Sequence, residues 1–457
     1  MMYAWLALTF VAACTTKRNP DVCCTTNADC QRLGGIPPTG CPDGFVCRDL
    51  LCEESTCSSS TDCPIEQPVC NMMTASCTAC ATATDCGSYT DTPICDTDSG
   101  ACRSCQLDAE CTSDVCDVDT GRCTEEDEII YASPTGIDTG LCTRDRPCST
   151  TRAIAIASTG SDSIIRLLPG LYTAPITISS GTMTIIGSGA VLRLPFQVFS
   201  PLEVRGTANV QVHRLEIDTV NSTSLVLSGV RCEGAGVEYP TLLLRDSIIH
   251  VFIVAKHSTL IIQNTTLGFD LDAQDDATIR IDRCHFRQTR GIDGAIGARG
   301  ARYDLRMTNS ILENIGIGFS TASTIPNSTQ LYLGFCTLVG DKPLQCPMSS
   351  SEDLAVFENS VFVSTLQGSD PVLLATGNNC AFINNLTFPQ SIELGGSNIN
   401  VDPMFVDLAT RDLRLKPGSP AIDRATSIAG PDFDHDFMGS PRPNGANSDL
   451  GAFEFTP

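Results

Sequence analysis

Residues 260–267 read LIIQNTTL, a strand-like apolar run followed by a polar turn at Asn264 and a second short apolar run. Five similar phrases occur at LLLRDSI (242–248), IRIDRCHF (279–286), LRMTNSI (305–311), LYLGFCTL (331–338) and VFENSV (356–361). Their turns lie 18 to 27 residues apart. A unit of roughly 20 residues with two or three short strands cannot bury its apolar face alone, so neighbouring units must stack. The phrase therefore predicts an all-β fold, a parallel β-helix in which each copy forms one rung.

The composition limits the class of protein. At 457 residues the chain is long enough for two or more domains. Hydrophobic residues at 42% supply a core, and aromatic residues at only 6% suit the narrow interior of a solenoid. The formal net charge of −24 would repel nucleic acid and anionic lipid headgroups, so neither is an expected partner. No apolar run reaches the 18 residues of a transmembrane helix.

The N-terminus predicts export with a lipid anchor. The apolar run at 3–13 is too short to span a bilayer and fits a signal peptide at 1–13. The small residues directly before Cys14 resemble the bacterial lipobox. This resemblance implies a lipoprotein acylated at Cys14, with a tether at 14–22, on the outer membrane or cell surface, touching the membrane only through the lipid. The alternative is an ordinary secretory signal with an incidental cysteine, because no Lys or Arg precedes the apolar run.

Cysteines are concentrated near the N-terminus, where 18 of the 26 fall between Cys23 and Cys123. Three four-cysteine units begin at Cys57, Cys80 and Cys105, and each opens with C-x5-C and closes with C-x6-C; residues 24–52 form a degenerate fourth unit. Such density predicts two disulfide bridges per unit in place of a core, with the connectivity open. Zinc is the alternative, because C-x2-C pairs join the units. The segment lacks histidine and the signal peptide implies an oxidising compartment, so disulfides in a stalk-like spacer are favoured.

The start of the β-helix carries a helix-like pattern at 150–158 and the turn Pro-Gly-Leu-Tyr at 169–172. This closely resembles the entry to pectate-lyase-like (pectin lyase-like) right-handed parallel β-helices of exported bacterial proteins. The resemblance implies a right-handed solenoid whose open end is plugged by the helix. Cys142 and Cys148 are close enough in the sequence to form a bridge that pins this cap.

The C-terminal segment 401–457 resembles the closing module of the choice-of-anchor Q domain family, which comprises surface β-helix proteins. The motifs are DPMF (402–405), GSPAID (418–423), Arg442-Pro443 and DLGAFE (449–454). The resemblance implies a module folded over the last rung, in which Arg442 forms a structural ion pair with Asp434, Asp436 or Asp449. The alternate carboxylates around Asp434 admit a calcium site as the other interpretation. The expected order of domains is signal peptide 1–13, tether 14–22, cysteine-rich disulfide repeats 23–123, linker 124–128, β-helix 129–400 and capping module 401–457.

Charged side chains gather on adjacent rungs. When the polar turns of successive phrases are aligned in the sequence, Lys256 and His257 fall at the same positions as the segment 272–276. A lyase of this fold needs carboxylates that bind calcium and a Lys or Arg that abstracts the proton next to a uronate carboxylate. The catalytic candidates are Lys256, Arg283 and Arg290, the calcium-binding candidates are Asp272, Asp275 and Asp276, and Asp270, Arg287 and Asp293 lie nearby in the sequence. The other interpretation is an ordinary solvated face of a solenoid.

Two functions of different classes follow. The first is a non-catalytic cell-surface lipoprotein, a disulfide-braced stalk that presents a β-helix for adhesion or glycan binding and needs no cofactor. The second is a calcium-dependent polysaccharide lyase or glycoside hydrolase that acts on an acidic glycan. The paired-aspartate and Gly-His-Gly signatures of polygalacturonases are missing, and lysines and aromatic residues are scarce. These observations favour the first function, with a glycan or another cell-surface ligand as the partner.

Replacing the lipidation candidate tests the predicted anchor. Cys14→Ser removes the thiol that would receive the diacylglycerol, so we expect the precursor to stay unprocessed and to incorporate no labelled fatty acid. The measurement is the mass of the cellular protein after growth with labelled palmitate. Maturation of the variant at the same position as the unaltered chain would contradict acylation.

Overall fold

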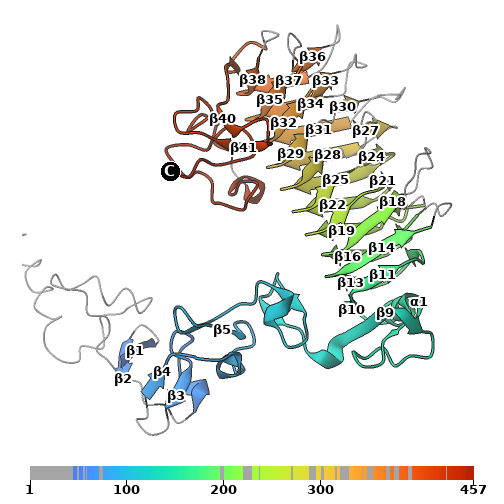
Figure 1. Ribbon diagram of the computed structural model, residues 1–457, viewed down its shortest axis with the longest axis vertical. Coiled ribbons are helices and arrows are strands. Elements are labelled where there is room, and N and C mark those ends of the chain that lie inside the picture. Colours follow the sequence, from blue (N-terminus) through green and yellow to red (C-terminus); the bar gives the residue numbers. More distant parts are fainter. Residues whose placement is uncertain are drawn as a thin grey trace, which may run out of the picture. The chain divides into compact units, whose positions relative to one another are not determined.

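The computed structural model divides into two compact units, residues 1–126 and 127–457, which are described separately (Figure 1). The structure describes residues 45–48, 51–54, 57, 59–71, 76–195, 200–219, 229–235, 237–268, 271–287, 295–299, 303–313, 316–319, 329–341, 343–346, 354–366, 371–374, 380–389, 394–428 and 430–457. The predicted signal peptide, Cys14, the tether and most of the degenerate cysteine unit lie outside these residues. Among the described residues, no helix is long and apolar enough to cross a bilayer.

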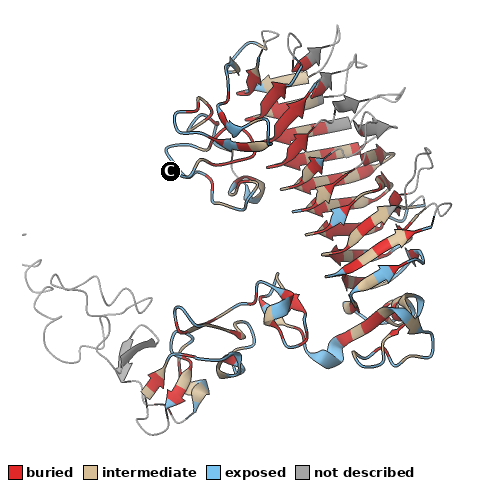
Figure 2. Cartoon of the chain, viewed as in Figure 1, coloured by how far each residue is buried: buried red, intermediate tan, exposed pale blue. Residues whose placement is uncertain are grey.

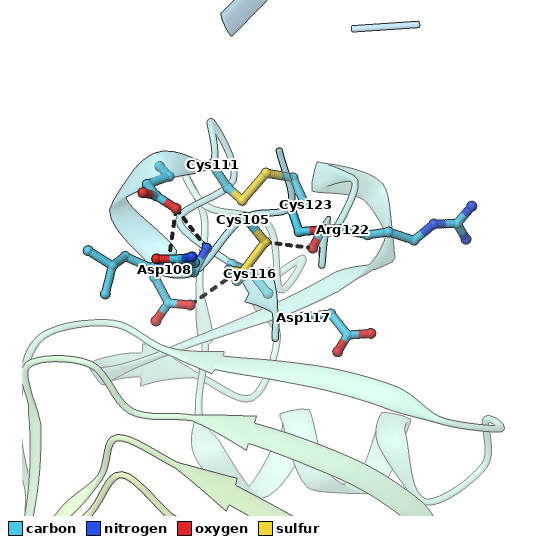
Figure 3. Close-up of a disulfide and its surroundings, with 12 residues drawn as sticks. Cys105, Asp108, Cys111, Cys116, Asp117, Arg122 and Cys123 are labelled. Atoms are coloured by element: carbon cyan, nitrogen blue, oxygen red, sulfur yellow. Dashed lines mark hydrogen bonds between the residues drawn. A yellow bond between two sulfur atoms is a disulfide. The ribbon is translucent and has the colours of Figure 1, made fainter. Parts of the chain in front are cut away.

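Each of the three regular cysteine units is closed by two interleaved disulfides, which join the first cysteine to the third and the second to the fourth. The bridges are Cys57–Cys70, Cys63–Cys77, Cys80–Cys95, Cys86–Cys102, Cys105–Cys116 and Cys111–Cys123. Figure 3 shows the two bridges of the third unit. The half-cystines form most of the small buried clusters in these units. The predicted pairing is confirmed, and the structure supplies the connectivity.

Each regular unit combines a short 3-10 helix with an antiparallel hairpin. The helices are η2 (Ser60–Asp62), η3 (Ala83–Cys86) and η4 (Asp108–Glu110); the hairpins are β3 (Val69–Asn71) with β4 (Ser76–Thr78), β5 (Ile94–Asp96) with β6 (Ala101–Arg103) and β7 (Cys116–Asp117) with β8 (Arg122–Cys123). A further hairpin joins β1 (Phe45–Arg48) and β2 (Leu51–Glu54). The acid before each second cysteine caps its helix: Asp85 Oδ2 accepts the N–H groups of Ala81 and Thr82, both at 2.8 Å. These bonds stabilise the carboxylate and lower the pKa of Asp85.

The interleaved connectivity can be tested by peptide mapping under non-reducing conditions. We expect linked peptides of the 1–3 and 2–4 type from each regular unit, because the first and third cysteines approach each other when the hairpin folds over the helix. Linked 1–2 and 3–4 peptides, free thiols or bound zinc in these units would contradict the arrangement.

The second unit confirms the predicted right-handed parallel β-helix. Its strands form three parallel sheets, and Figure 1 shows the strands stacked one above another along the solenoid. Sheet one contains β9 (Ile129–Ile137), β10 (Ser163–Leu167), β13 (Thr182–Ile186), β16 (Asn209–His213), β19 (Thr241–Arg245), β22 (Thr259–Gln263), β25 (Ala277–Asp282), β28 (Tyr303–Thr308), β31 (Thr329–Gly334), β34 (Leu354–Glu358) and β37 (Cys380–Ile383). Sheet two contains β11 (Gly170–Tyr172), β14 (Ala190–Leu194), β17 (Glu216–Thr219), β20 (Ile248–Ile249), β23 (Thr266–Leu267), β26 (His285–Arg287), β29 (Ile311–Glu313), β32 (Thr337–Gly340), β35 (Val361–Ser364), β38 (Leu386–Phe388) and β39 (Ile399–Asn400). Sheet three contains β12 (Ile176–Ile178), β15 (Leu202–Arg205), β18 (Gly229–Glu233), β21 (Phe252–Lys256), β24 (Leu271–Gln274), β27 (Ala295–Arg299), β30 (Gly316–Phe319), β33 (Leu344–Cys346) and β36 (Val372–Leu374).

The interior is filled by side chains stacked in register. Leu260 and Ile262 of β22 lie beside Ile279 and Ile281 of β25, and all four are buried. The residues between them face outward and are partly exposed, as the burial colours of Figure 2 show along the strands. This alternation is what a strand with one buried face requires.

The turns between sheets one and two form a ladder of left-handed residues. Their positive φ angles occur at Arg214, Asp246, Asn264, Arg283, Asn309, Phe335, Asn359 and Asn384. The N–H of all but the last donates to a carbonyl at the end of the sheet-one strand in the next rung, as from Asn264 to Asp282 at 3.0 Å and from Asn359 to Ile383 at 3.1 Å. The N–H of Asn384 donates to Ser397 Oγ at 2.9 Å. The predicted turns are therefore confirmed; in the phrase at 279–286, Asp282 is the last residue of β25 and Arg283 is the turn residue. Asn and Asp tolerate this conformation better than most residues, which explains their recurrence.

The residue after each turn forms a second, buried ladder. Ser310 Oγ accepts the N–H of Cys284 at 3.0 Å, and Ser360 Oγ accepts the N–H of Cys336 at 3.1 Å. Cys284 and Cys336 are thus small interior residues with free thiols, and burial raises the pKa of Cys336 to about 12. Because the Cys336 thiol is free, it forms no disulfide with Cys346 at the end of β33.

The N-terminal end is closed as the sequence predicted. Helix α1 (Thr150–Ala157) begins after Ser149, whose side chain accepts the Arg152 N–H, and it buries Ala153 and Ala157 in the interior of the solenoid. The predicted Cys142–Cys148 disulfide is present. At the end of β11, the Tyr172 hydroxyl lies within hydrogen-bond distance of the carbonyls of Ala132 and Leu168. The short helix η5 (Glu126–Glu128) lies in the predicted linker.

The C-terminal module packs along the side of the solenoid, whereas the sequence predicted a cap over the last rung. It contains the hairpin β40 (Phe405–Asp407) with β41 (Asp412–Leu415) and the helix η6 (Pro431–Phe433). Its apolar residues share one cluster with outward-facing residues of sheet two, including Ile311, Val339 and Val361. The described residues of β29, β32 and β35 are consequently buried on both faces. Apolar outer faces of these strands explain why the module covers the side.

The turn ladder also holds the module through side-chain amides. Asn359 Oδ1 accepts the Thr426 N–H at 2.9 Å, and Asn359 Nδ2 donates to the Thr426 carbonyl at 3.0 Å. Asn384 Nδ2 donates to the Arg424 carbonyl at 2.8 Å. At the last rung, the side chain of Asn398 accepts the Asn385 N–H. It thus supplies the acceptor that the side chain of a further rung would provide.

Arg442 forms a buried ion pair, but its partner differs from the prediction. Its Nη1 lies 2.6 Å from Glu454 Oε1, and its guanidinium also donates to the carbonyls of His435, Asp449 and Gly451. The predicted partners have other contacts. Asp436 accepts three main-chain N–H groups, Asp449 accepts two, and Asp434 lies against His435. Burial raises the pKa of Asp449 to about 6.

Replacing two ladder asparagines compares buried and exposed positions. Asn359→Ala loses the amide contacts to Thr426 and forces alanine into a left-handed turn, so we expect a cost of about 3 kcal/mol in the free energy of unfolding. The control Asn264→Ala occupies the same turn position, where the side chain is exposed, and should cost about 1 kcal/mol. Urea denaturation followed by circular dichroism measures both. Equal costs would contradict a role for Asn359 in holding the module.

Candidate functional site

The strongest candidate site lies at the turn from sheet three to sheet one. Lys256 ends β21, and His257 adopts a left-handed conformation with φ of 43°. In the next rung, Gln274 ends β24 and aligns with Lys256, and the turn continues through Asp275 and Asp276. The His257 N–H donates to the Asp275 carbonyl at 2.7 Å. The predicted stacking of the two segments is therefore present.

Lys256 and His257 each face a carboxylate across these two rungs. Lys256 Nζ lies 3.4 Å from Asp275 Oδ2, and His257 Nδ1 lies 3.5 Å from Asp276 Oδ2. All four side chains are partly exposed. Exposed pairs of this kind contribute about 0–1 kcal/mol each to stability, so the pairs fix the positions of polar groups more than they hold the fold.

An exposed tyrosine beside these pairs was not identified from the sequence. The loop before β19 carries Tyr239, which is 51% exposed and lies edge-on to His257 with 6.4 Å between ring centroids. Val237 in the same loop is 92% exposed. The loop is held against the turn because the Gly234 N–H donates to the Lys256 carbonyl, and a Cβ at Gly234 would lie 2.3 Å from the His257 carbonyl oxygen. We define the turn cluster as Tyr239, Lys256, His257, Asp275 and Asp276.

The three predicted calcium ligands hold different positions. Asp272 lies within β24, where its Oδ2 accepts the Gln274 amide at 2.7 Å. Asp275 and Asp276 face Lys256 and His257. Within the described part of the chain, the groups of three potential ligands whose atoms lie within 4.8 Å of one another are all formed by disulfide-bonded cysteines. The three aspartates therefore do not form a preassembled cation site.

The other predicted catalytic residues are not part of the turn cluster. Arg283 is the turn residue between β25 and β26, which is a different corner of the rung from Lys256, and its Nε lies 3.2 Å from Asp282 Oδ2. Arg287 is the exposed last residue of β26. Arg290, Asp270 and Asp293 lie outside the described residues.

The comparisons with known proteins show a likeness to a solved structure. No family model matches the chain, and no curated protein matches it. A solved structure titled "Crystal structure of pectate lyase Pel9A" is similar, with 15% sequence identity over 72% of this chain and 96% of that chain, and a TM-score of 0.41. At that score the likeness adds nothing to the assignment of residues, which depends on the geometry described above.

Proposed function

We propose that the protein is a non-catalytic cell-surface lipoprotein whose β-helix binds a glycan at the turn cluster. The observation that carries this proposal is the half-exposed ring of Tyr239 beside the ion pair of Lys256 with Asp275 and the contact of His257 with Asp276. An aromatic ring offers an apolar face to the C–H groups of a sugar, and carboxylates and ammonium groups can bind its hydroxyls. The rigid turn orients these groups before a ligand arrives, which reduces the entropy lost on binding.

The position on the cell surface belongs to the same proposal. The six disulfides of the three regular cysteine units, all within the described residues, are typical of proteins that mature in an oxidising compartment. Together with the lipobox-like sequence before Cys14 they support export, lipid anchoring and a stalk that carries the β-helix. The resemblance to the choice-of-anchor Q domain family fits this arrangement.

The alternative is a calcium-dependent polysaccharide lyase or glycoside hydrolase that acts on an acidic glycan. A lyase base needs a lone pair to take a proton. Lys256 instead faces the carboxylate of Asp275 at 3.4 Å, and an ammonium group in an ion pair has no lone pair to offer. This contact favours binding over catalysis at the turn cluster.

A glycan panel with matched variants tests the proposal. We expect the purified protein to bind at least one glycan, and Tyr239→Ala to weaken that binding about 3- to 10-fold, which corresponds to the loss of one aromatic contact. The control is Leu171→Ala, which removes another exposed apolar side chain, on sheet two. Isothermal titration calorimetry measures the affinities.

The same panel of glycans also tests for lyase activity. Absorbance of unsaturated uronates that appears with calcium and is lost in Lys256→Ala or Asp272→Ala would reverse the assignment in favour of the lyase. Equal affinity of Tyr239→Ala and the unaltered protein for a bound glycan would remove the turn cluster from the binding site.

A further inference from the structure

The segment 430–439 of the C-terminal module, which we call the strap, crosses the turn ladder. Asn309 Nδ2 donates to the Asp432 carbonyl in the strap at 2.8 Å. The Phe433 ring packs against Tyr332 and Phe335, with ring centroids 6.1 and 5.9 Å away. Phe433 and Phe335 are buried by this contact. The strap therefore covers aromatic side chains of the β-helix.

A histidine joins the strap to the β-helix through both of its ring nitrogens. His435 Nε2 lies 2.8 Å from Oδ2 of Asp282 on β25, and His435 Nδ1 lies 2.7 Å from Oδ1 of Asp434. An ionised carboxylate only accepts hydrogen bonds, so both ring nitrogens must carry protons if both bonds are made. This geometry requires the imidazolium form of His435.

The Asp282 carboxylate is held in place for this contact. Its Oδ1 accepts from Thr308 Oγ1 at 2.8 Å and from Asn309 Nδ2 at 2.9 Å. The side chains of Asp282 and His435 are only 16% and 23% exposed, so water screens their attraction weakly. A neutral His435 would keep one N–H, and its other ring nitrogen would face a carboxylate with no proton between them.

We propose that the strap is a proton-operated latch, closed on the β-helix while His435 is an imidazolium and loosened when His435 loses its proton. Loosening separates the Phe433 ring of the strap from Tyr332 and Phe335, against which it packs. This inference concerns the seam of the C-terminal module and is independent of the function proposed for the turn cluster.

The charged groups around the seam define the pH range of the latch. The hydrogen bond with Asp282 raises the pKa of His435 above its ordinary 6.5, against the opposing effects of burial and of Arg283. Burial raises the pKa of Asp282, but its bonds to His435, Asn309 and Thr308 outweigh that effect and leave it below the ordinary 3.8. Other charged groups also face the strap. Arg306 lies 3.5 Å from Asp432 and over the Phe433 ring, and Arg442 donates to the His435 carbonyl at 3.0 Å. His285 lies 2.8 Å from Glu313 and edge-on to Phe437.

The directions of the two pKa shifts define one pH range in which the closed strap is most stable. A raised pKa of His435 stabilises the closed strap fully below pH 6.5, and this contribution is lost as the pH rises through the folded value. A lowered pKa of Asp282 stabilises it above pH 3.8, and this contribution is lost as the pH falls through the folded value. The latch should therefore be tightest between these limits and should loosen on the alkaline side.

The test combines two measurements on the full chain. NMR of labelled histidine gives the pKa of His435, and hydrogen exchange with mass spectrometry gives the protection of peptides covering 430–439 at pH 6 and pH 9, corrected for intrinsic rates. We expect protection to fall tenfold for each unit by which the folded pKa exceeds that of the unfolded chain. Peptides from the β22 region serve as the internal reference and should keep their protection.

Two variants assign the effect to one side chain. His435→Gln should make the protection of the strap independent of pH and equal to the alkaline value of the unaltered protein, whereas the control His285→Gln should keep the pH dependence. Unchanged protection between pH 6 and pH 9 in the unaltered protein would overturn the proposal. Persistence of the dependence in His435→Gln, or its loss in His285→Gln, would overturn it equally.

Discussion

The β-helix depends on one constraint, the turn between sheets one and two that recurs from rung to rung. A single residue in the left-handed conformation makes this turn and donates its N–H to the next rung, as Asn264 does to the carbonyl of Asp282. Because a shift of one residue would move every side chain to the other face of its strand, this repeated bond fixes which residues enter the interior. The buried Ser and Cys ladder, the apolar stacks and the exposed turn cluster all follow from that register.

The same ladder explains how the C-terminal module is attached. Asn359 and Asn384 keep their backbone in the turn, and their amides bind the main chain of the module. Outward-facing apolar residues of sheet two, such as Val339 and Val361, complete the contact. The solenoid therefore presents two kinds of surface, a sealed side under the module and an open corner at the turn cluster, and the proposed glycan site lies on the open one.

Local patterns predicted much of the fold, and contacts distant in the sequence accounted for the rest. The rung period, the helix at 150–158 and the cysteine pairing are each encoded within a few tens of residues. Docking between distant segments determines that Glu454 is the partner of Arg442 and that the module lies along sheet two. The sequence did contain one signal of the second contact, because the unbroken apolar runs of β32 and β35 are typical of strands buried on both faces. The stacking of Lys256 and His257 on the segment 272–276 followed from the period. Tyr239 was missed because its loop belongs to no repeat with which it could be aligned.

Paired cysteine substitutions test the in-register stacking of the rungs most directly. Ile248 of β20 aligns with Thr266 of β23, which aligns in turn with His285 of β26. Neighbouring strands lie about 5 Å apart, within the reach of a disulfide, whereas alternate strands lie about 10 Å apart, which is beyond it. With stacked parallel rungs, we expect the double variant Ile248→Cys with Thr266→Cys to form a disulfide under mild oxidation. We expect Ile248→Cys with His285→Cys to form none. Equal bridging of both pairs, or bridging only of the second, would contradict the stacked parallel rungs.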